Sequence, residues 1–109
     1  MNQPVDLIQG KEYVSVNFKE DISLDTASKE LGYEKHYLSR CFHQVIPMNF
    51  SKYINTLRVD FASELLQNTD MSITEIALES GFQSIRNFNR VFCEVTGKTP
   101  REFSSITTL

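Results

Sequence analysis

The feature that most limits how this chain can fold is an internal repeat. The stretch 23–33 matches the stretch 72–82 at an offset of 49 positions, and each runs from Ser and an aliphatic residue to Gly and an aromatic residue. Beyond that point the offset is 50, and it pairs Leu38 with Phe88, Arg40 with Arg90 and Phe42 with Phe92. Each copy has the pattern of a short helix, a glycine turn and a longer helix. The sequence therefore predicts a helix-turn-helix unit that is present twice.

Apolar residues recur with helical spacing along the chain, and no segment alternates with period two. At 109 residues the chain has the length of one domain. We expect an all-α fold of about seven helices, in which two helix-turn-helix subdomains (residues 5–46 and 72–105) flank a long central helix (residues 50–67). The runs Ser72–Glu75 and Thr99–Glu102 have the capping-box form that begins a helix.

The longer helix of each copy has an apolar and a polar face. Residues predicted to face the core are Leu38, Cys41, Phe42 and Val45 in the first copy, and Phe88, Val91, Phe92 and Val95 in the second. The long central helix should bury a stripe that includes Phe50, Ile54, Phe61 and Leu65. Polar side chains that align between the copies should face outward: His36, Ser39, Arg40 and His43, and then Arg86, Asn89, Arg90 and Cys93. Such a face suits a recognition helix, since Arg can pair with guanine, Asn with adenine, and Ile85 with a thymine methyl group.

The charge distribution favours the second copy as the stronger DNA contact. The whole chain is acidic, with 11 basic and 14 acidic residues. From Ser80 to Arg101, however, four basic residues and one acidic residue give a net charge of +3, and the remainder carries −6. A basic patch on an acidic body is compatible with nucleic acid, because binding depends on the face that meets the ligand.

Other kinds of site find little support in the sequence. His36 and His43 are seven residues apart, which is about 10 Å along a helix and too far for one metal ion. The two cysteines, Cys41 and Cys93, lie outside any metal-ligand pattern, as expected in a reducing cytoplasm. No acid–base or nucleophile constellation is recognisable, so we expect no enzyme, metal or cofactor. No apolar run approaches the ~20 residues that span a bilayer and no secretory leader opens the chain, so we expect no membrane partner.

Four motifs follow one another in the second half of the chain: Arg58-Val59-x-x-Ala62-x-x-Leu65-Leu66, Ser72-Ile73-x-x-Ile76-Ala77-x-x-x-Gly81-Phe82, Phe88-x-Arg90-x-Phe92 and Gly97-x-Thr99-Pro100-x-x-Phe103. Together with the repeat, they resemble the AraC/XylS-type DNA-binding domain over nearly the whole chain. The resemblance implies a bacterial transcription regulator in the cytoplasm. Its two recognition helices would read adjacent major-groove segments of double-stranded promoter DNA.

The resemblance also implies a role for individual positions. It assigns base reading to His36, Ser39, Arg40, Ile85, Arg86, Asn87 and Arg90. It assigns contacts with the DNA backbone to Lys35, Tyr37, His43, Ser84 and Asn89. The helical wheel places Asn89 on the groove face instead, so both roles of Asn89 stay open.

The chain departs from the family pattern at three places. Cys93 stands where a lysine is common, and its counterpart in the first copy is His43. Ile46-Pro47 replaces the glycine that usually follows the first recognition helix, and Phe103-Ser104 replaces a Tyr-Arg pair. The changes at Cys93, His43 and Ser104 remove positive charge, which predicts a modest affinity for DNA.

Two further partners are expectations. Members of this family often carry a separate N-terminal sensor or dimerisation domain, so we expect either a small regulator or the C-terminal piece of a longer one. A second class of function also stays open, namely a protein-interaction module with little DNA affinity of its own. In that case the acidic body would contact RNA polymerase or a partner domain.

Overall fold

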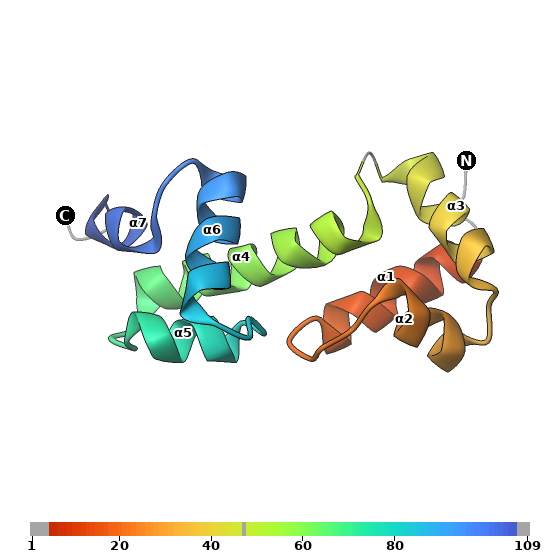
Figure 1. Cartoon of the computed structure of the whole chain (residues 1–109), viewed down its shortest axis with the longest axis horizontal. Coiled ribbons are helices and arrows are strands. Elements are labelled where there is room, and N and C mark those ends of the chain that lie inside the picture. Colours follow the sequence, from red (N-terminus) through yellow and green to blue (C-terminus); the bar gives the residue numbers. More distant parts are fainter. Residues whose placement is uncertain (1–4, 47, 107–109) are drawn as a thin grey trace. The chain divides into compact units, whose positions relative to one another are not determined.

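In its described part, the computed structural model consists of helices joined by short turns and loops (Figure 1). It describes the backbone of residues 5–46 and 48–106 and the side chains of residues 11–44, 46 and 48–104. These residues form seven α-helices and no strand: α1 (Val5–Asn17), α2 (Leu24–Leu31), α3 (Lys35–Val45), α4 (Phe50–Asn68), α5 (Ile73–Glu79), α6 (Ile85–Thr96) and α7 (Pro100–Ile106). The all-α prediction is therefore confirmed. None of the helices in this part combines the length and the apolar composition that crossing a membrane requires.

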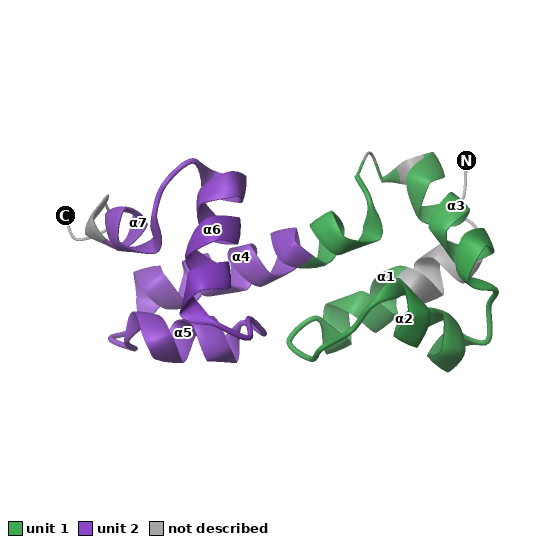
Figure 2. Ribbon diagram, in the orientation of Figure 1, with its two compact units in different colours: residues 1–54 green, residues 55–109 purple. Residues whose placement is uncertain are grey.

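The chain divides into two compact units, Met1–Ile54 and Asn55–Leu109 (Figure 2). Unit 1 holds α1, α2, α3 and the start of α4, and unit 2 holds the rest of α4 with α5, α6 and α7. Each unit therefore contains one copy of the sequence repeat.

Both glycine turns of the repeat are present, and they share a left-handed glycine and a closing hydrogen bond, although Gly32 caps α2 directly whereas Ser80 caps α5. Gly32 and Gly81 have φ angles of 77° and 95°, in the left-handed region that side chains with a Cβ disfavour. The small residue four positions before each glycine is buried, so that two helices can approach closely. The same hydrogen bond closes each turn: Tyr33 N–H to the Ser28 carbonyl and Phe82 N–H to the Ala77 carbonyl, both at 3.0 Å.

Capping side chains begin the helices where the sequence predicts them. Ser72 Oγ accepts the N–H of Glu75 at 3.1 Å ahead of α5, as Ser23 does in the equivalent place ahead of α2. The predicted box ahead of α7 is reciprocal, because Glu102 N–H donates to Thr99 Oγ1 at 3.1 Å and Thr99 N–H donates to Glu102 Oε1 at 3.2 Å. These bonds satisfy N–H groups that a helix N-terminus otherwise leaves unpaired.

The core of unit 1 forms where α3 packs against the start of α4. The ring of Phe42 meets the ring of Phe50 edge-on, with centroids 5.1 Å apart, and lies 5.8 Å from the ring of Tyr53. Helix α1 contacts both α2 and α3 and buries Val14 completely. The apolar face predicted for the first recognition helix is confirmed at Leu38, Cys41 and Phe42, whereas the Val45 side chain and Pro47 lie outside the described residues.

The core of unit 2 is a row of aromatic rings. Phe92 lies 5.6 Å from Phe88 and 5.4 Å from Phe103, and Phe88 lies 5.1 Å from Phe82. The Phe92–Phe103 pair stands 50 positions after the Phe42–Tyr53 pair, so the repeat extends to the packing of the cores. Apolar residues from α4, α5 and α6 complete this cluster: Val59, Ala62, Leu66, Ile76, Ala77 and Val91.

One prediction of burial is wrong and a second holds only in part. Val95 is 37% exposed, because it lies in the last turn of α6, past the turns of the helix that the core covers. On α4, Phe61 and Leu65 are only half-buried, although Leu65 packs against the core of unit 2, and the buried positions of α4 in that unit are Val59, Ala62 and Leu66. The sequence predicts one continuous buried stripe along α4. The two ends of the helix instead pack into two separate cores, so the buried positions change along it.

Candidate nucleic-acid interface

In unit 2 the exposed side of α6 carries most of the residues predicted to read bases. The helix begins at Ser84, whose Oγ accepts the N–H of Asn87 at 3.1 Å. Phe88, Val91 and Phe92 turn inward and are buried, so the opposite side of the helix faces solvent. That side presents one apolar and three polar side chains that could contact DNA: Ile85, Arg86, Asn89 and Arg90.

Arg90 is held by two neighbours on its own helix. Its Nη1 donates to Glu94 Oε1 at 2.9 Å, and its Nη2 donates to Asn87 Oδ1 at 2.6 Å. Asn87 is half-buried and engaged with Arg90, so it lies in a different environment from the exposed side chain that the resemblance implies. Glu94 was missed as a site residue, although its spacing of four positions from an arginine is the signal for such a pair.

In unit 1 the candidate face lies on α3, which a carboxylate caps. Glu34 Oε2 accepts the N–H of Tyr37 at 2.9 Å. Hydrogen bonds from the backbone N–H groups of His36 and Tyr37 hold the pKa of Glu34 below its ordinary value. A negative charge therefore already occupies the N-terminus of this helix, where the helix dipole would otherwise favour an external anion.

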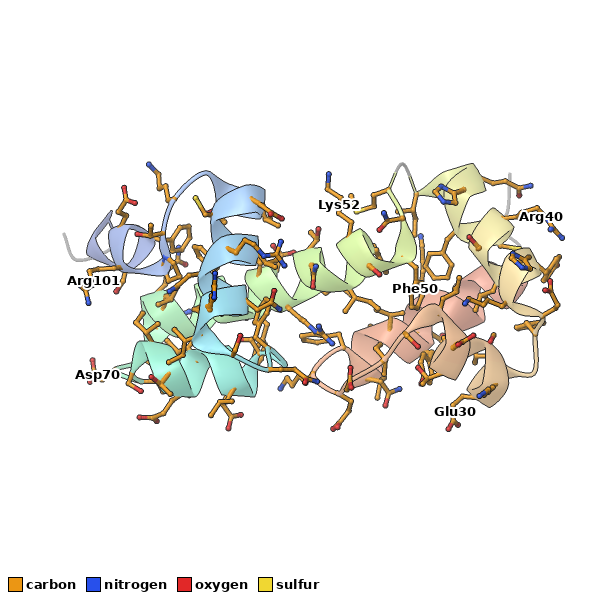
Figure 3. The ribbon with its side chains drawn as sticks, viewed as in Figure 1. Glu30, Arg40, Phe50, Lys52, Asp70 and Arg101 are labelled. Atoms are coloured by element: carbon orange, nitrogen blue, oxygen red, sulfur yellow. The ribbon has the colours of Figure 1, made fainter. Side chains whose placement is uncertain are left out.

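Arg40 is the counterpart of Arg90, and it has a different neighbour. Its guanidinium lies over the ring of Tyr37, 5.9 Å from the ring centroid, at a distance typical of a cation–π contact. Figure 3 shows the Arg40 side chain pointing away from the body of unit 1. The other residues predicted on this face are exposed at His36 and His43 and half-buried at Ser39.

Lys35 is predicted to contact the DNA backbone, and it forms a surface ion pair within unit 1. Its Nζ lies 3.4 Å from Asp25 Oδ1, and the two side chains are 49% and 61% exposed. Exposed pairs of this kind contribute little to stability. Lys35 can therefore exchange Asp25 for a phosphate group at small cost.

A groove of about 470 Å³ lies beside α6 in unit 2. It is lined by Ile73 and Thr74 of α5, by Ile85 and Asn89 of α6, and by Thr99, Pro100 and Arg101 where α7 begins. The Arg101 side chain extends away from the ribbon of α7 (Figure 3). The sequence identifies Arg101 only as one charge of the basic patch, and the structure adds that it lines the same groove as Asn89.

The sequence predicts that possible metal ligands and cysteines play no part in the site. Among the described residues, no group of three His, Cys, Asp or Glu side chains is placed to hold a metal ion. Both cysteines are free, with Cys41 buried and Cys93 exposed as the helical spacing predicts. The candidate site consists of the exposed faces of α3 and α6, each described within its own unit.

Comparison with known families and proteins gives a consistent result. A family model described as a helix-turn-helix domain matches residues 27–105. An uncharacterized HTH-type transcriptional regulator of Staphylococcus aureus is 36% identical over 92 residues, which are 84% of this chain and 12% of that relative. The regulatory protein SoxS of Salmonella typhimurium is 30% identical over 92 residues, which are 84% of this chain and 86% of SoxS. The chain thus spans a small part of the first relative and most of the second.

Solved structures of the same architecture are also similar to this chain. The C-terminal domain of AraT, a response regulator from Geobacillus stearothermophilus, matches with a TM-score of 0.95 and 24% identity over 100% of this chain and 91% of that one. An AraC-type transcriptional regulator from Chromobacterium violaceum matches with a TM-score of 0.87 and 31% identity over 95% and 93%. The DNA-binding domain of AdpA, solved in complex with a target DNA, matches with a TM-score of 0.85 and 21% identity over 92% and 90%.

Proposed function

The chain belongs to the AraC/XylS-type family of helix-turn-helix DNA-binding domains, and from that premise we propose that it is the sequence-specific DNA-binding domain of a bacterial transcription regulator. Its recognition helices are α3 and α6, and each reads one major-groove segment of promoter DNA. The observation that carries this proposal is the matched pair of exposed arginines. Arg40 and Arg90 occupy equivalent positions on equivalent helices, each opposite a buried aromatic core.

Base reading is assigned to the outer faces of the two helices. Arg86 and Arg90 on α6 carry donor forks that fit the O6 and N7 acceptors of guanine. Ile85, 42% exposed, offers an apolar surface to a thymine methyl group. On α3 the corresponding set is His36, Ser39 and Arg40, with Asn87 on α6 acting through Arg90 as well as through any base contact of its own.

Contacts with the DNA backbone are assigned to the edges of these faces. Lys35, Tyr37 and His43 border the reading face of α3, and Ser84 borders that of α6. Asn89 lines the groove that Arg101 also lines, which supports a contact with phosphate rather than with a base. Arg101 joins this set because a cation at the rim of the groove attracts the same phosphate.

The test is selection from random duplexes of roughly 30 base pairs, about three helical turns, at two salt concentrations. The wild-type chain should enrich two short boxes about one turn apart. Arg90→Ala and Arg40→Ala should each cost ~1–3 kcal/mol of discrimination at one base position. Lys35→Ala should weaken all sequences alike and lower the salt slope by about 1. If the arginine variants weakened selected and random DNA equally, the assignment of base reading would be wrong.

Protein partners are a second proposal with its own support. The S. aureus relative is far longer than the 92 residues that it shares with this chain, so an N-terminal sensor or dimerisation domain is proposed by analogy. The acidic remainder of the chain, with its net charge of −6 outside Ser80–Arg101, is proposed to contact RNA polymerase. Contact with promoter DNA and RNA polymerase would require the bacterial cytoplasm, which we propose as the location. Heparin retention separates the two functions, because a DNA reader should bind and elute with salt whereas an acidic adaptor should flow through.

A further inference from the structure

The contacts around Arg90 point to a residue that sets specificity without itself facing a base. We propose that Glu94 is a positioning residue, which together with Asn87 fixes the guanidinium of Arg90 and so sharpens the choice of base by α6. This inference rests on the proposed function, since it concerns how the same helix face reads DNA. The three residues are called the Arg90 clamp below.

The clamp lies along one side of α6. Asn87 precedes Arg90 by three positions and Glu94 follows it by four, so both stand on the same face as the arginine, one turn away on either side. Different nitrogens of the guanidinium donate the two hydrogen bonds, Nη2 to Asn87 Oδ1 at 2.6 Å and Nη1 to Glu94 Oε1 at 2.9 Å. They restrict its rotation as well as its reach.

The clamp leaves enough donors for a guanine. An arginine side chain has five N–H donors, and the clamp occupies two of them. A bidentate contact with O6 and N7 needs two more, so the fork can meet the base while both clamp bonds persist. The two bonds favour one orientation of the guanidinium, so fixing it on a base costs less conformational entropy than fixing an arginine without such partners.

Glu94 also changes what Arg90 prefers to contact. The side chains of Glu94 and Arg90 are 62% and 61% exposed and form an ion pair, so their opposite charges largely cancel toward DNA. A phosphate group is repelled by the carboxylate, whereas the acceptors on a guanine edge carry no full charge. The clamp therefore weakens the sequence-independent attraction of Arg90 more than its reading of a base.

Unit 1 provides the internal comparison. Position 44, four after Arg40, holds Gln44 where unit 2 holds Glu94, and position 37 holds Tyr37 where unit 2 holds Asn87. The guanidinium of Arg40 rests on the Tyr37 ring and has no carboxylate at the i+4 position. The Glu34 carboxylate acts on it only as a weaker charge, and of the causes that lower the pKa of Glu34 the backbone hydrogen bonds come first and the charge of Arg40 last. Arg40 is thus expected to attract any DNA sequence more strongly, and to distinguish bases less, than Arg90.

The experiment exchanges, in the full chain, the residue types at positions 44 and 94. Glu94→Gln gives α6 the side chain of α3, and Gln44→Glu gives α3 the side chain of α6. Affinity is measured for the selected duplex, for a scrambled duplex and for duplexes changed only at the base that each arginine reads. The ratio of selected to scrambled affinity is the readout, since a purely structural role would not move it, and far-UV circular dichroism checks that the helices persist.

With Glu94→Gln, binding to scrambled DNA should tighten, and the discrimination at the Arg90 base should fall by roughly three- to tenfold. Gln44→Glu should do the opposite at the Arg40 base. If Glu94→Gln strengthened selected and scrambled DNA by the same factor, Glu94 would act only by general repulsion and the clamp would be overturned. Failure of the wild-type chain to enrich any sequence would instead overturn the proposed function.

Discussion

Units 1 and 2 share a helical framework, meaning their turns, caps and core contacts, and differ in the side chains exposed on α3 and α6. The glycine turns, the Phe42–Tyr53 and Phe92–Phe103 contacts and the serine caps are repeated from one unit to the other. The equivalent arginines are not treated alike, since one rests on an aromatic ring and the other is held by a carboxylate and an amide. Packing permits few solutions for the framework, whereas an exposed helix face tolerates many. The difference between the units is therefore where a difference in DNA reading should originate.

The N-termini of the two recognition helices differ in the opposite sense, because here it is unit 1 that carries the carboxylate. Helix α3 is capped by the carboxylate of Glu34, and α6 by the hydroxyl of Ser84. A phosphate group approaching α6 meets a neutral cap and the positive end of the helix dipole, but at α3 it meets a carboxylate. We therefore expect unit 2 to supply more of the affinity for DNA.

The largest expected effect comes from removing the equivalent core rings. Phe42 and Phe92 are 1% and 0% exposed, so Phe42→Ala and Phe92→Ala should each destabilise their own unit by about 3–5 kcal/mol through the cavity left behind. Hydrogen exchange is the measurement. Phe92→Ala should expose amides of α5, α6 and α7, and Phe42→Ala those of α1, α2 and α3. Equal loss of protection in both units with either variant would show that the units fold together, and would break the comparison.

The framework was predictable because it depends on spacing that the sequence displays. Gly32 and Gly81 mark the turns, Ser72 and Thr99 mark the caps, and Phe88 and Phe92 recur at helical intervals. Each of these depends on neighbours within about five positions, which periodicity can detect. The burial predicted for Val95 is wrong for the opposite reason. Its exposure depends on where the core ends along α6, and not on its angular position on the helix.

The site was predictable in outline and not in detail. Helical spacing separates the outer face from the inner one, so the exposure of Arg40, Arg86 and Arg90 follows from the pattern. Which partner each arginine selects depends on rotamers, and the pattern of polar residues leaves them open. From the sequence, Glu94 is recognised only as the single negative charge within the basic patch. Its bond to Arg90 shows that the charge has a specific partner.

An intermediate effect is expected from the left-handed glycines. Gly32 ends α2 in unit 1 at φ 77°, and Gly97 ends α6 in unit 2 at φ 80°. A Cβ at either position would meet no atom within 4 Å, so Gly32→Ala and Gly97→Ala should each cost about 1–2 kcal/mol through backbone strain alone. Urea unfolding measures this loss. A much larger cost at Gly97 than at Gly32 would mean that the end of α6 carries a further constraint that the equal φ angles do not explain.

The smallest effect concerns the cap of α3 and depends on pH. Because backbone N–H groups lower the pKa of Glu34 below its ordinary value of 4.5, its ionised form stabilises the folded state. That contribution is complete above pH 4.5 and is lost as the pH falls through the lowered folded-state pKa. Glu34→Ser should keep a cap and remove this dependence from unit 1. Glu102, whose pKa is lowered chiefly by the N–H of Thr99, should keep unit 2 acid-sensitive in the same variant and so serves as the internal control.

The same substitution sharpens the comparison at the level of DNA. With a neutral cap, α3 should resemble α6, and Glu34→Ser should tighten DNA binding by roughly two- to fivefold at low salt, an effect that added salt should screen. Ser84→Glu is the matched reversal and should weaken binding. If Ser84→Glu weakened binding and Glu34→Ser left it unchanged, the N-terminus of α3 would not face a phosphate. The weaker reading expected of unit 1 would then have to arise from Arg40 and its aromatic neighbour, and not from the charge on the cap.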